Sequence, residues 1–169
     1  MTQIQIISKL ELNKDVFKSM FSGLSMEEIL WKPLPEKWCL LEIVCHLYDE
    51  EREDFRARTK HALEIPEQAM PKIDPQGWVT QRKYLERDFD EMVTLFLNER
   101  DQSVKWLQSL QSPLWKNIYH HPTAGELSAE MFLSNWLAHD LLHFRQITYT
   151  KYQFLISNFN SRFDYAGNW

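Results

Sequence analysis

Two histidines, His139 and His143, stand four residues apart in a largely apolar helical pattern, NWLAHDLLHFRQI. Four residues of α-helix rise about 6 Å and return to the same face, so both imidazoles can reach one metal ion. A buried imidazole has two ring nitrogens to satisfy, which makes it an unfavourable replacement for leucine. The spacing therefore indicates a metal site, and the alternative is a pair of hydrogen-bonded core histidines.

A third histidine, His46, lies at the edge of an apolar stripe in VCHLYDEE, and Glu50 follows it one turn later. Three neutral imidazoles can each give a lone pair to one divalent cation and leave coordination positions open for water or substrate. We therefore predict that His46, His139 and His143 hold one divalent ion, and imidazole ligands leave Zn, Ni and Fe open as its identity. Glu50 is the candidate general base, and its alternative roles are a fourth ligand or an ordinary ion pair.

Other charged residues near these motifs are predicted to face away from the site. Asp140 takes the position that glutamate has in HExxH metalloproteases, but its side chain is shorter and the third ligand lies upstream, which disfavours a protease. We expect Asp140 to be exposed or to lie behind a ligand, and Asp49 and Glu51 to face solvent. Arg145, two residues beyond His143, should turn toward the surface or a dimer contact. The sequence lacks the paired ExxH motifs of a ferritin-like di-iron site.

Three other sets of residues have weaker indications. The remaining histidines lie near loops and are expected at the surface: His61, His120 and His121. Three tryptophans can form apolar walls of a pocket, although aromatic residues at helical spacing are more often plain core: Trp38, Trp78 and Trp136. The two cysteines, Cys39 and Cys45, have neither CxxC nor metal-finger spacing and are predicted to be free thiols.

The elements that must position these residues are long stretches between breaks rich in proline and glycine. We predict helices over about 2–23, 39–63, 81–110 and 129–157, the third of them uninterrupted, with a short capped turn after Ser25. The segments between them are predicted to be loops, and no strand is expected. The last dozen residues form a tail that can fold back through its aromatic side chains. This pattern predicts an all-α, antiparallel four-helix bundle as one domain over residues 1–169.

The fourth helix carries the histidines on the stripe that should face the bundle interior. Its residues follow one another in steps of four, three, four and four: Phe132, Trp136, His139, His143 and Ile147. Such spacing is typical of the inward seam of a bundle helix. Both imidazoles are therefore predicted to point into the bundle, toward His46 on the second helix.

Composition restricts the classes of partner. The formal charge of −5 and the lack of a long Lys/Arg run argue against nucleic acid. The chain has neither a signal-like apolar segment at its start nor a stretch long enough to cross a bilayer, so no membrane is expected. Together with the cysteine pattern, this predicts a cytoplasmic protein. We expect its partner to be a small-molecule substrate.

Two segments of the chain resemble a known family. WCLLEIVCHLYDEE and HHPTAGELSAEMFLSNWLAHDLLHFRQI are similar to the W-S-x-x-E-x-x-x-H-L and H-D-x-x-H-x-x-Q-I signatures of the DinB/YfiT-like metal-binding bundles. The resemblance covers nearly the whole chain in order, and it implies a divalent metal on His46, His139 and His143. One departure is Cys39, where the family usually has Ser, which should weaken the helix cap without touching the ligands.

The family resemblance also implies an activity class. It implies a metal-dependent hydrolase or a thiol S-transferase that uses a low-molecular-weight thiol such as bacillithiol, mycothiol or glutathione, and it suggests a homodimer. It leaves the substrate open, because many members have no known reaction. Two other hypotheses stand beside an enzyme: a bundle in which a coordinatively saturated ion only fixes the helices, and a scaffold without metal. An open coordination position beside an apolar cavity would favour the enzyme.

Overall fold

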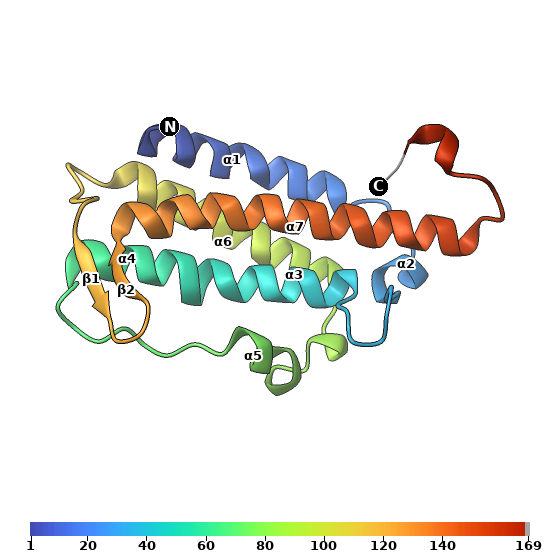
Figure 1. The fold of residues 1–169 in the computed structure, drawn as a ribbon, viewed down its shortest axis with the longest axis horizontal. Coiled ribbons are helices and arrows are strands. Elements are labelled where there is room, and N and C mark those ends of the chain that lie inside the picture. The colour runs from blue at the N-terminus through green and yellow to red at the C-terminus, as the bar shows by residue number, and fades with distance from the viewer. Residues whose placement is uncertain (168–169) are drawn as a thin grey trace.

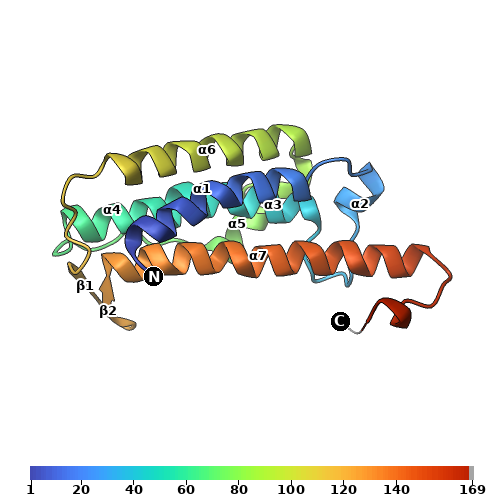
Figure 2. The same cartoon turned by 90° about the horizontal axis from the view of Figure 1, so that it is seen from above.

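The computed structural model describes residues 1–167, in which four long helical segments run side by side (Figure 1). They are α1 (Gln3–Met20), the continuous stretch from α3 (Leu40–Asp49) to α4 (Arg56–Glu64), α6 (Phe89–Ser109) and α7 (Ala129–Asn158). Helix α1 packs against both α6 and α7, α3 packs against α6, and α4 packs against α7 (Figure 2). The predicted four-helix bundle is confirmed.

Three of the predicted helix starts are fixed by hydroxyl side chains. The Thr2 hydroxyl accepts a hydrogen bond from a backbone N–H in the first turn of α1, and Ser25 does the same for the short helix α2 (Met26–Leu30). Ser128 caps α7 by accepting from the N–H of Met131. Each cap satisfies an N–H that has no partner within the helix, and at Ser25 and Ser128 this signal was readable from the sequence.

The second predicted helix contains an irregularity that the sequence pattern did not indicate. A π-helical turn, η1 (Glu50–Phe55), joins α3 to α4, and within it the N–H of Arg56 donates to the carbonyl of Glu51. Bonds between residues five apart accommodate one extra residue in the turn. The inward face therefore shifts by one position along this helix.

Helix α5 (Pro75–Gln81) lies where only a loop was predicted, and that part of the prediction is wrong. Asp74 caps it by accepting from the N–H of Gly77, and Pro75 occupies the first helical position, where a missing N–H is harmless. Trp78 of this helix is buried in the same cluster as α3 side chains.

The third helix was predicted to be uninterrupted from Gln81, which is also wrong. Lys83 adopts a left-handed conformation (φ 51°) and a single 3-10 turn, η2 (Tyr84–Glu86), follows it. Helix α6 then begins afresh, with Asp88 accepting from the N–H of Glu91. The break swings α5 and η2 against α3 (Figure 1).

Two short strands interrupt the otherwise helical chain, although no strand was predicted. β1 (Ile118–His121) and β2 (Gly125–Ser128) pair antiparallel, with Ile118 opposite Ser128. Strands of four residues are too short for an alternating pattern to compete with the longer helical periods. The hairpin leads directly into the start of α7 (Figure 1).

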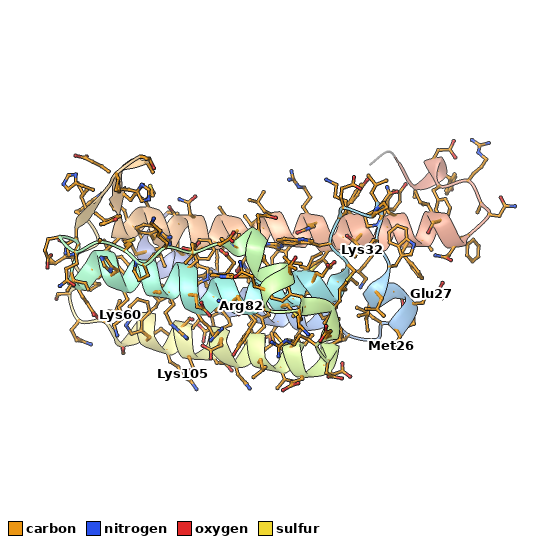
Figure 3. The ribbon with its side chains drawn as sticks, turned by 90° about the horizontal axis from the view of Figure 1, so that it is seen from below. Met26, Glu27, Lys32, Lys60, Arg82 and Lys105 are labelled. Atoms are coloured by element: carbon orange, nitrogen blue, oxygen red, sulfur yellow. The ribbon has the colours of Figure 1, made fainter. Side chains whose placement is uncertain are left out.

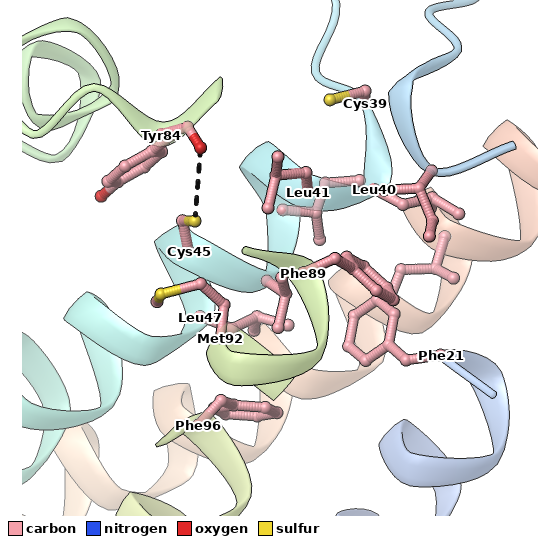
Figure 4. Close-up of a cluster of buried hydrophobic side chains, with 14 of the residues drawn as sticks. Phe21, Cys39, Leu40, Leu41, Cys45, Leu47, Tyr84, Phe89, Met92 and Phe96 are labelled. Carbon is pink, nitrogen blue, oxygen red and sulfur yellow. Dashed lines mark hydrogen bonds between the residues drawn. The ribbon is translucent and has the colours of Figure 1, made fainter. Parts of the chain in front are cut away.

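The largest part of the core lies between α1, α3 and α6, where aromatic rings such as Phe17 and Phe96 are fully buried. Figure 4 shows the end of this cluster, in which the Cys45 thiol lies 3.9 Å from the carbonyl oxygen of Tyr84. Both cysteines are free and buried, as predicted. Burial raises the pKa of Cys39 to about 11 and that of Cys45 to about 12, so neither thiol is poised to react.

Two further predictions concern the membrane and the tail. Within residues 1–167, every helix is too short or too polar to cross a bilayer. The tail makes a 3-10 turn, η3 (Asp164–Ala166), and the side chains of Phe159 and Tyr165 are exposed rather than packed back on the bundle. Its last two residues, Asn168 and Trp169, lie outside the described residues.

Candidate metal centre

Helices α3 and α7 bring the three predicted histidines to one point. The Nε2 atom of His139 lies 3.4 Å from that of His46 and 3.0 Å from that of His143. One ligand atom from each residue can be chosen so that all three lie within 4.8 Å of one another. The convergence that the seam pattern predicts is therefore present between two separate helices.

The imidazoles are held in their neutral form. Burial, the largest cause, lowers the pKa of His46 to about 3, that of His139 to about 2 and that of His143 to about 4. For His139 the two neighbouring histidines and Arg100 lower the pKa further. Near neutral pH each ring therefore keeps a nitrogen lone pair, which is the form that binds metals.

The donor set fits a divalent cation of the kind that imidazoles prefer. Metal–nitrogen distances of about 2.0–2.1 Å place two ligand nitrogens about 3.3 Å apart in a tetrahedral site, close to the two Nε2 separations measured here. A ligand histidine usually forms a hydrogen bond through its second ring nitrogen. That bond is missing for two of the three, because the buried Nδ1 atoms of His46 and His143 have no hydrogen-bond partner among the described residues.

One side of the histidine group is packed by aromatic rings. The ring centroid of Phe55 lies 4.8 Å from that of His139, and the centroid of Trp38 lies 4.8 Å from that of His46. The other two predicted pocket walls lie elsewhere. Trp136 is fully buried and donates its Nε1–H to Glu51, and Trp78 stacks on an arginine at the end of α5.

The histidine group also borders a cavity of about 570 Å³. Its lining includes His139 and His143 of α7, together with Trp38 from the loop before α3. A ligand of small-molecule size fits this volume. The cavity thus reaches the two histidines of α7.

A buried charge cluster lies directly behind the histidines and overturns one prediction. Arg100 of α6 donates to both carboxylate oxygens of Glu51, at 2.9 Å each, and to both of Asp140, at 2.7 Å each. All three side chains are almost fully buried. Glu51 does not face solvent, because the π turn rotates it inward. Asp140 takes the second of its two predicted positions, behind a ligand, where it pairs with this arginine beside His143.

Asp49 was also predicted to face solvent, and it is buried instead. It accepts a hydrogen bond from the Tyr84 hydroxyl at 2.7 Å and forms ion pairs with Arg52 and Arg82. Arg82 reaches it from the end of α5, which packs along α3 (Figure 3). The burial of Asp49 depends on α5, an element that the sequence pattern did not reveal.

Glu50 lies in the π turn and is 4% exposed. Burial, together with the carboxylate of Asp54, raises its pKa to about 8, and Arg58 opposes this rise. Its Oε1 atom has no hydrogen-bond partner within residues 1–167. These neighbours lie along its own helical stretch, and Glu50 is not part of the three-histidine group.

The remaining predicted residues lie outside the group. The ring of His61 contacts the carbonyl oxygen of Gln68, and the other two histidines lie in β1. Arg145 is exposed, as predicted, yet its side chain lines the cavity beside the histidines, as does Gln146. The step of three from His143 to Gln146 continues the inward seam and was available as a signal. No comparable pattern marks Lys37, which lines the cavity from the loop before α3.

Comparison with known proteins supports the fold. A family model described as the DinB superfamily matches residues 9–147 of the chain. Among solved structures, YfiT from Bacillus subtilis, a probable metal-dependent hydrolase with an unusual four-helix bundle topology, matches with a TM-score of 0.79. The sequences are 19% identical, and the match covers 90% of this chain and 87% of YfiT. No curated protein matches the chain in sequence.

Proposed function

The chain belongs to the DinB superfamily, and we propose that it is a metal-dependent enzyme of the hydrolase type that acts on a small molecule. His46, His139 and His143 are the proposed ligands of one divalent ion. The observation that carries the proposal is the meeting of three neutral imidazoles from two helices beside an open cavity. YfiT, with the same fold, is a probable metal-dependent hydrolase, which supports the same class of reaction.

Two properties of the histidines suit them to bind a metal ion: they are neutral near pH 7, and their rings are held in place by packing. Their lowered pKa values keep protons from competing for the nitrogen atoms near neutral pH. A bound divalent cation supplies Lewis acidity, which polarises a carbonyl or phosphoryl group. Packing of Phe55 against His139 and of Trp38 against His46 limits movement of the rings.

Glu50 is the proposed proton-transfer residue. A carboxyl group whose pKa is about 8 holds a proton at neutral pH and releases it close to that range, which suits general acid–base chemistry. Its unpartnered Oε1 atom is free to accept or donate one further hydrogen bond. The alternative reaction at the same site is transfer of a substrate group to the sulfur of a low-molecular-weight thiol. The same cavity would admit such a thiol.

Metal analysis of the purified protein tests the proposal. After reconstitution with Zn²⁺, Ni²⁺ or Fe²⁺ and removal of excess metal, we expect one ion per chain. His46→Ala, His139→Ala and His143→Ala should each lower the stoichiometry, whereas His61→Ala, outside the group, should leave it unchanged. A screen of ester, amide and phosphoester hydrolysis and of thiol transfer then identifies the reaction. A stoichiometry near zero in the wild-type protein would overturn the proposal.

A saturated ion that only fixes the helices would behave differently in the same experiments. It would bind one per chain, yet the loaded protein would show no exchangeable ligand position and no turnover. The cavity that reaches His139 and His143 argues against this role, because a structural site is closed by its protein ligands.

A further inference from the structure

The cavity beside the histidines has an unusual distribution of charge. Besides the two histidines, its lining contains two cationic side chains, Lys37 and Arg145, and no carboxylate. The charge of the cavity lining is thus opposite in sign to the formal net charge of the chain, which is −5. The excess of positive charge is therefore a property of this cavity and not of the whole surface.

The two cations also lack the partners that neighbouring cations have. Among the described residues, neither Lys37 nor Arg145 forms an ion pair. By contrast, Lys32, on the same loop as Lys37, pairs with Glu42 at 2.7 Å. The nearest acidic residue in sequence to His139 is Asp140, and both of its oxygens are directed at Arg100. No carboxylate of the described cavity wall is thus available to neutralise the pair.

The remaining walls would suit an organic molecule that carries the anionic group. Trp38, Pro33 and Leu142 contribute apolar surface, and Gln146 contributes an amide. The volume of about 570 Å³ lies within the range of small-molecule sites. Both cations are exposed at the rim, and their long stems can extend over apolar surface while the charged ends stay in water.

We propose that Lys37 and Arg145 form an anion-binding subsite, which recognises a carboxylate or phosphate group of the substrate at the rim of the cavity. An arginine guanidinium presents paired donors that match either oxyanion, and lysine adds a second positive charge. The subsite lies in the same cavity as His139 and His143, so a molecule held by its anionic end extends toward the histidines. This inference rests on the proposed function for the identity of the reacting end.

A binding subsite that is separate from the reacting atoms has a defined kinetic signature. Its contacts are equally strong in the ground state and in the transition state, so their loss weakens binding without slowing the bound reaction. Loss of one charge-assisted contact of about 1.5–3 kcal/mol corresponds to roughly 10-fold to 100-fold weaker binding. We expect effects of this size for each cation.

Calorimetric titration with malonate and with inorganic phosphate tests the subsite directly, with neutral malonamide as the matched probe. Lys37→Met and Arg145→Met should each weaken binding of the preferred anion by about 10-fold or more, and the double variant should abolish it. Lys105→Met, which removes an exposed lysine of α6 (Figure 3), should change nothing. Whichever anion binds more tightly shows whether the group is a carboxylate or a phosphate.

Repeating the titrations on chelator-treated and Zn²⁺-loaded protein, with malonate for the loaded form, separates the two proposals. Binding that needs Lys37 and Arg145 in both forms supports the subsite, even if the metal analysis fails. Binding that appears only with Zn²⁺, is lost in His139→Ala and is unchanged in Arg145→Met would place the anion on the metal and overturn the subsite. Unaltered metal stoichiometry in Lys37→Met and Arg145→Met shows that the variants fold.

Discussion

Two buried polar clusters meet at neighbouring residues of α7, and they are satisfied in opposite ways. His139 belongs to the histidine group, and Asp140 belongs to the charge cluster with Arg100. All five N–H groups of Arg100 have acceptors: the carboxylates of Glu51 and Asp140 and the carbonyl oxygen of Leu10. The chain completes this cluster by itself.

The histidine group is not completed by the chain. Its three Nε2 atoms face one another, and the buried Nδ1 atoms of two members have no partner among the described residues. A buried polar group without a partner costs about 1–3 kcal/mol, so a chain selected only for stability would place leucine here. The contrast supports the proposed function, in which the histidines bind an ion and the charge cluster is structural.

The two clusters also influence each other. The positive charge of Arg100 is one of the causes that lower the pKa of His139. Because Arg100 is paired with two carboxylates, its helix, the π turn and α7 are tied together at the level of the histidines. The charge cluster therefore ties α7, which carries two of the histidines, to the neighbouring helical segments.

The largest expected effect comes from breaking the charge cluster. Arg100→Met leaves Glu51 and Asp140 buried without a counter-charge, and we expect the free energy of unfolding to fall by about 3–5 kcal/mol. Urea or guanidinium unfolding followed by circular dichroism measures this loss.

The matched control removes an arginine whose ion pair is exposed. Arg162→Met breaks the pair with Asp164 in the tail, and it should change the free energy of unfolding by less than about 0.5 kcal/mol. If Arg100→Met lowered the free energy of unfolding as little as Arg162→Met does, the charge cluster would not be a structural element of the fold.

Removing a histidine should have a smaller effect on stability than removing Arg100, and this effect should appear only when metal is present. A ligand present at about 100 times its dissociation constant stabilises the folded state by about 2.7 kcal/mol. We therefore expect added Zn²⁺ or Ni²⁺ to raise the melting temperature of the wild-type protein and chelator to reverse the rise.

The variant His143→Ala should abolish that metal-dependent rise, whereas His120→Ala, on an exposed strand position, should retain it. Thermal unfolding with and without metal measures both. If metal still raised the melting temperature of His143→Ala, the ion would bind elsewhere, and the three histidines would not be its ligands.

Much of this architecture could be predicted from sequence, because local signals specified it. Hydroxyl caps at Ser25 and Ser128 marked helix starts, and the seam through His139 and His143 indicated the inward face of α7. With His46 on an apolar stripe, these signals indicated the convergence of the three imidazoles, and the family resemblance implied the same three residues.

The charge cluster could not be predicted in the same way. An arginine within a helix normally indicates an exposed face, and Arg100 is inward only because carboxylates from two other helical segments meet it there. Glu51 reaches it through a π turn, which shifts the inward face by one residue and has no mark in the apolar pattern. Similarly, the burial of Asp49 required α5, whose capped start at Asp74 was hidden among several prolines.

The smallest expected effect concerns Glu50, which belongs to neither cluster. Burial raises its pKa to about 8, so the folded state holds a proton that the unfolded state releases near pH 4.5. Between these values the folded state binds more protons, and stability must therefore fall as pH rises. Glu50→Gln is neutral at every pH and should remove this part of the fall, about 1–2 kcal/mol between pH 6.5 and 8.0.

Denaturant unfolding at these two pH values, with wild-type and Glu50→Gln proteins treated with chelator, measures the difference. The pKa values of the three buried histidines lie below this window in the folded state, and their contribution is common to both proteins and cancels. If the free energy of unfolding changed equally with pH in the two proteins, Glu50 would already be ionised and would not be the proton-holding residue. A slope that disappears from the wild-type protein when metal is added would instead show that the ion favours the Glu50 carboxylate, which joins this residue to the histidine group.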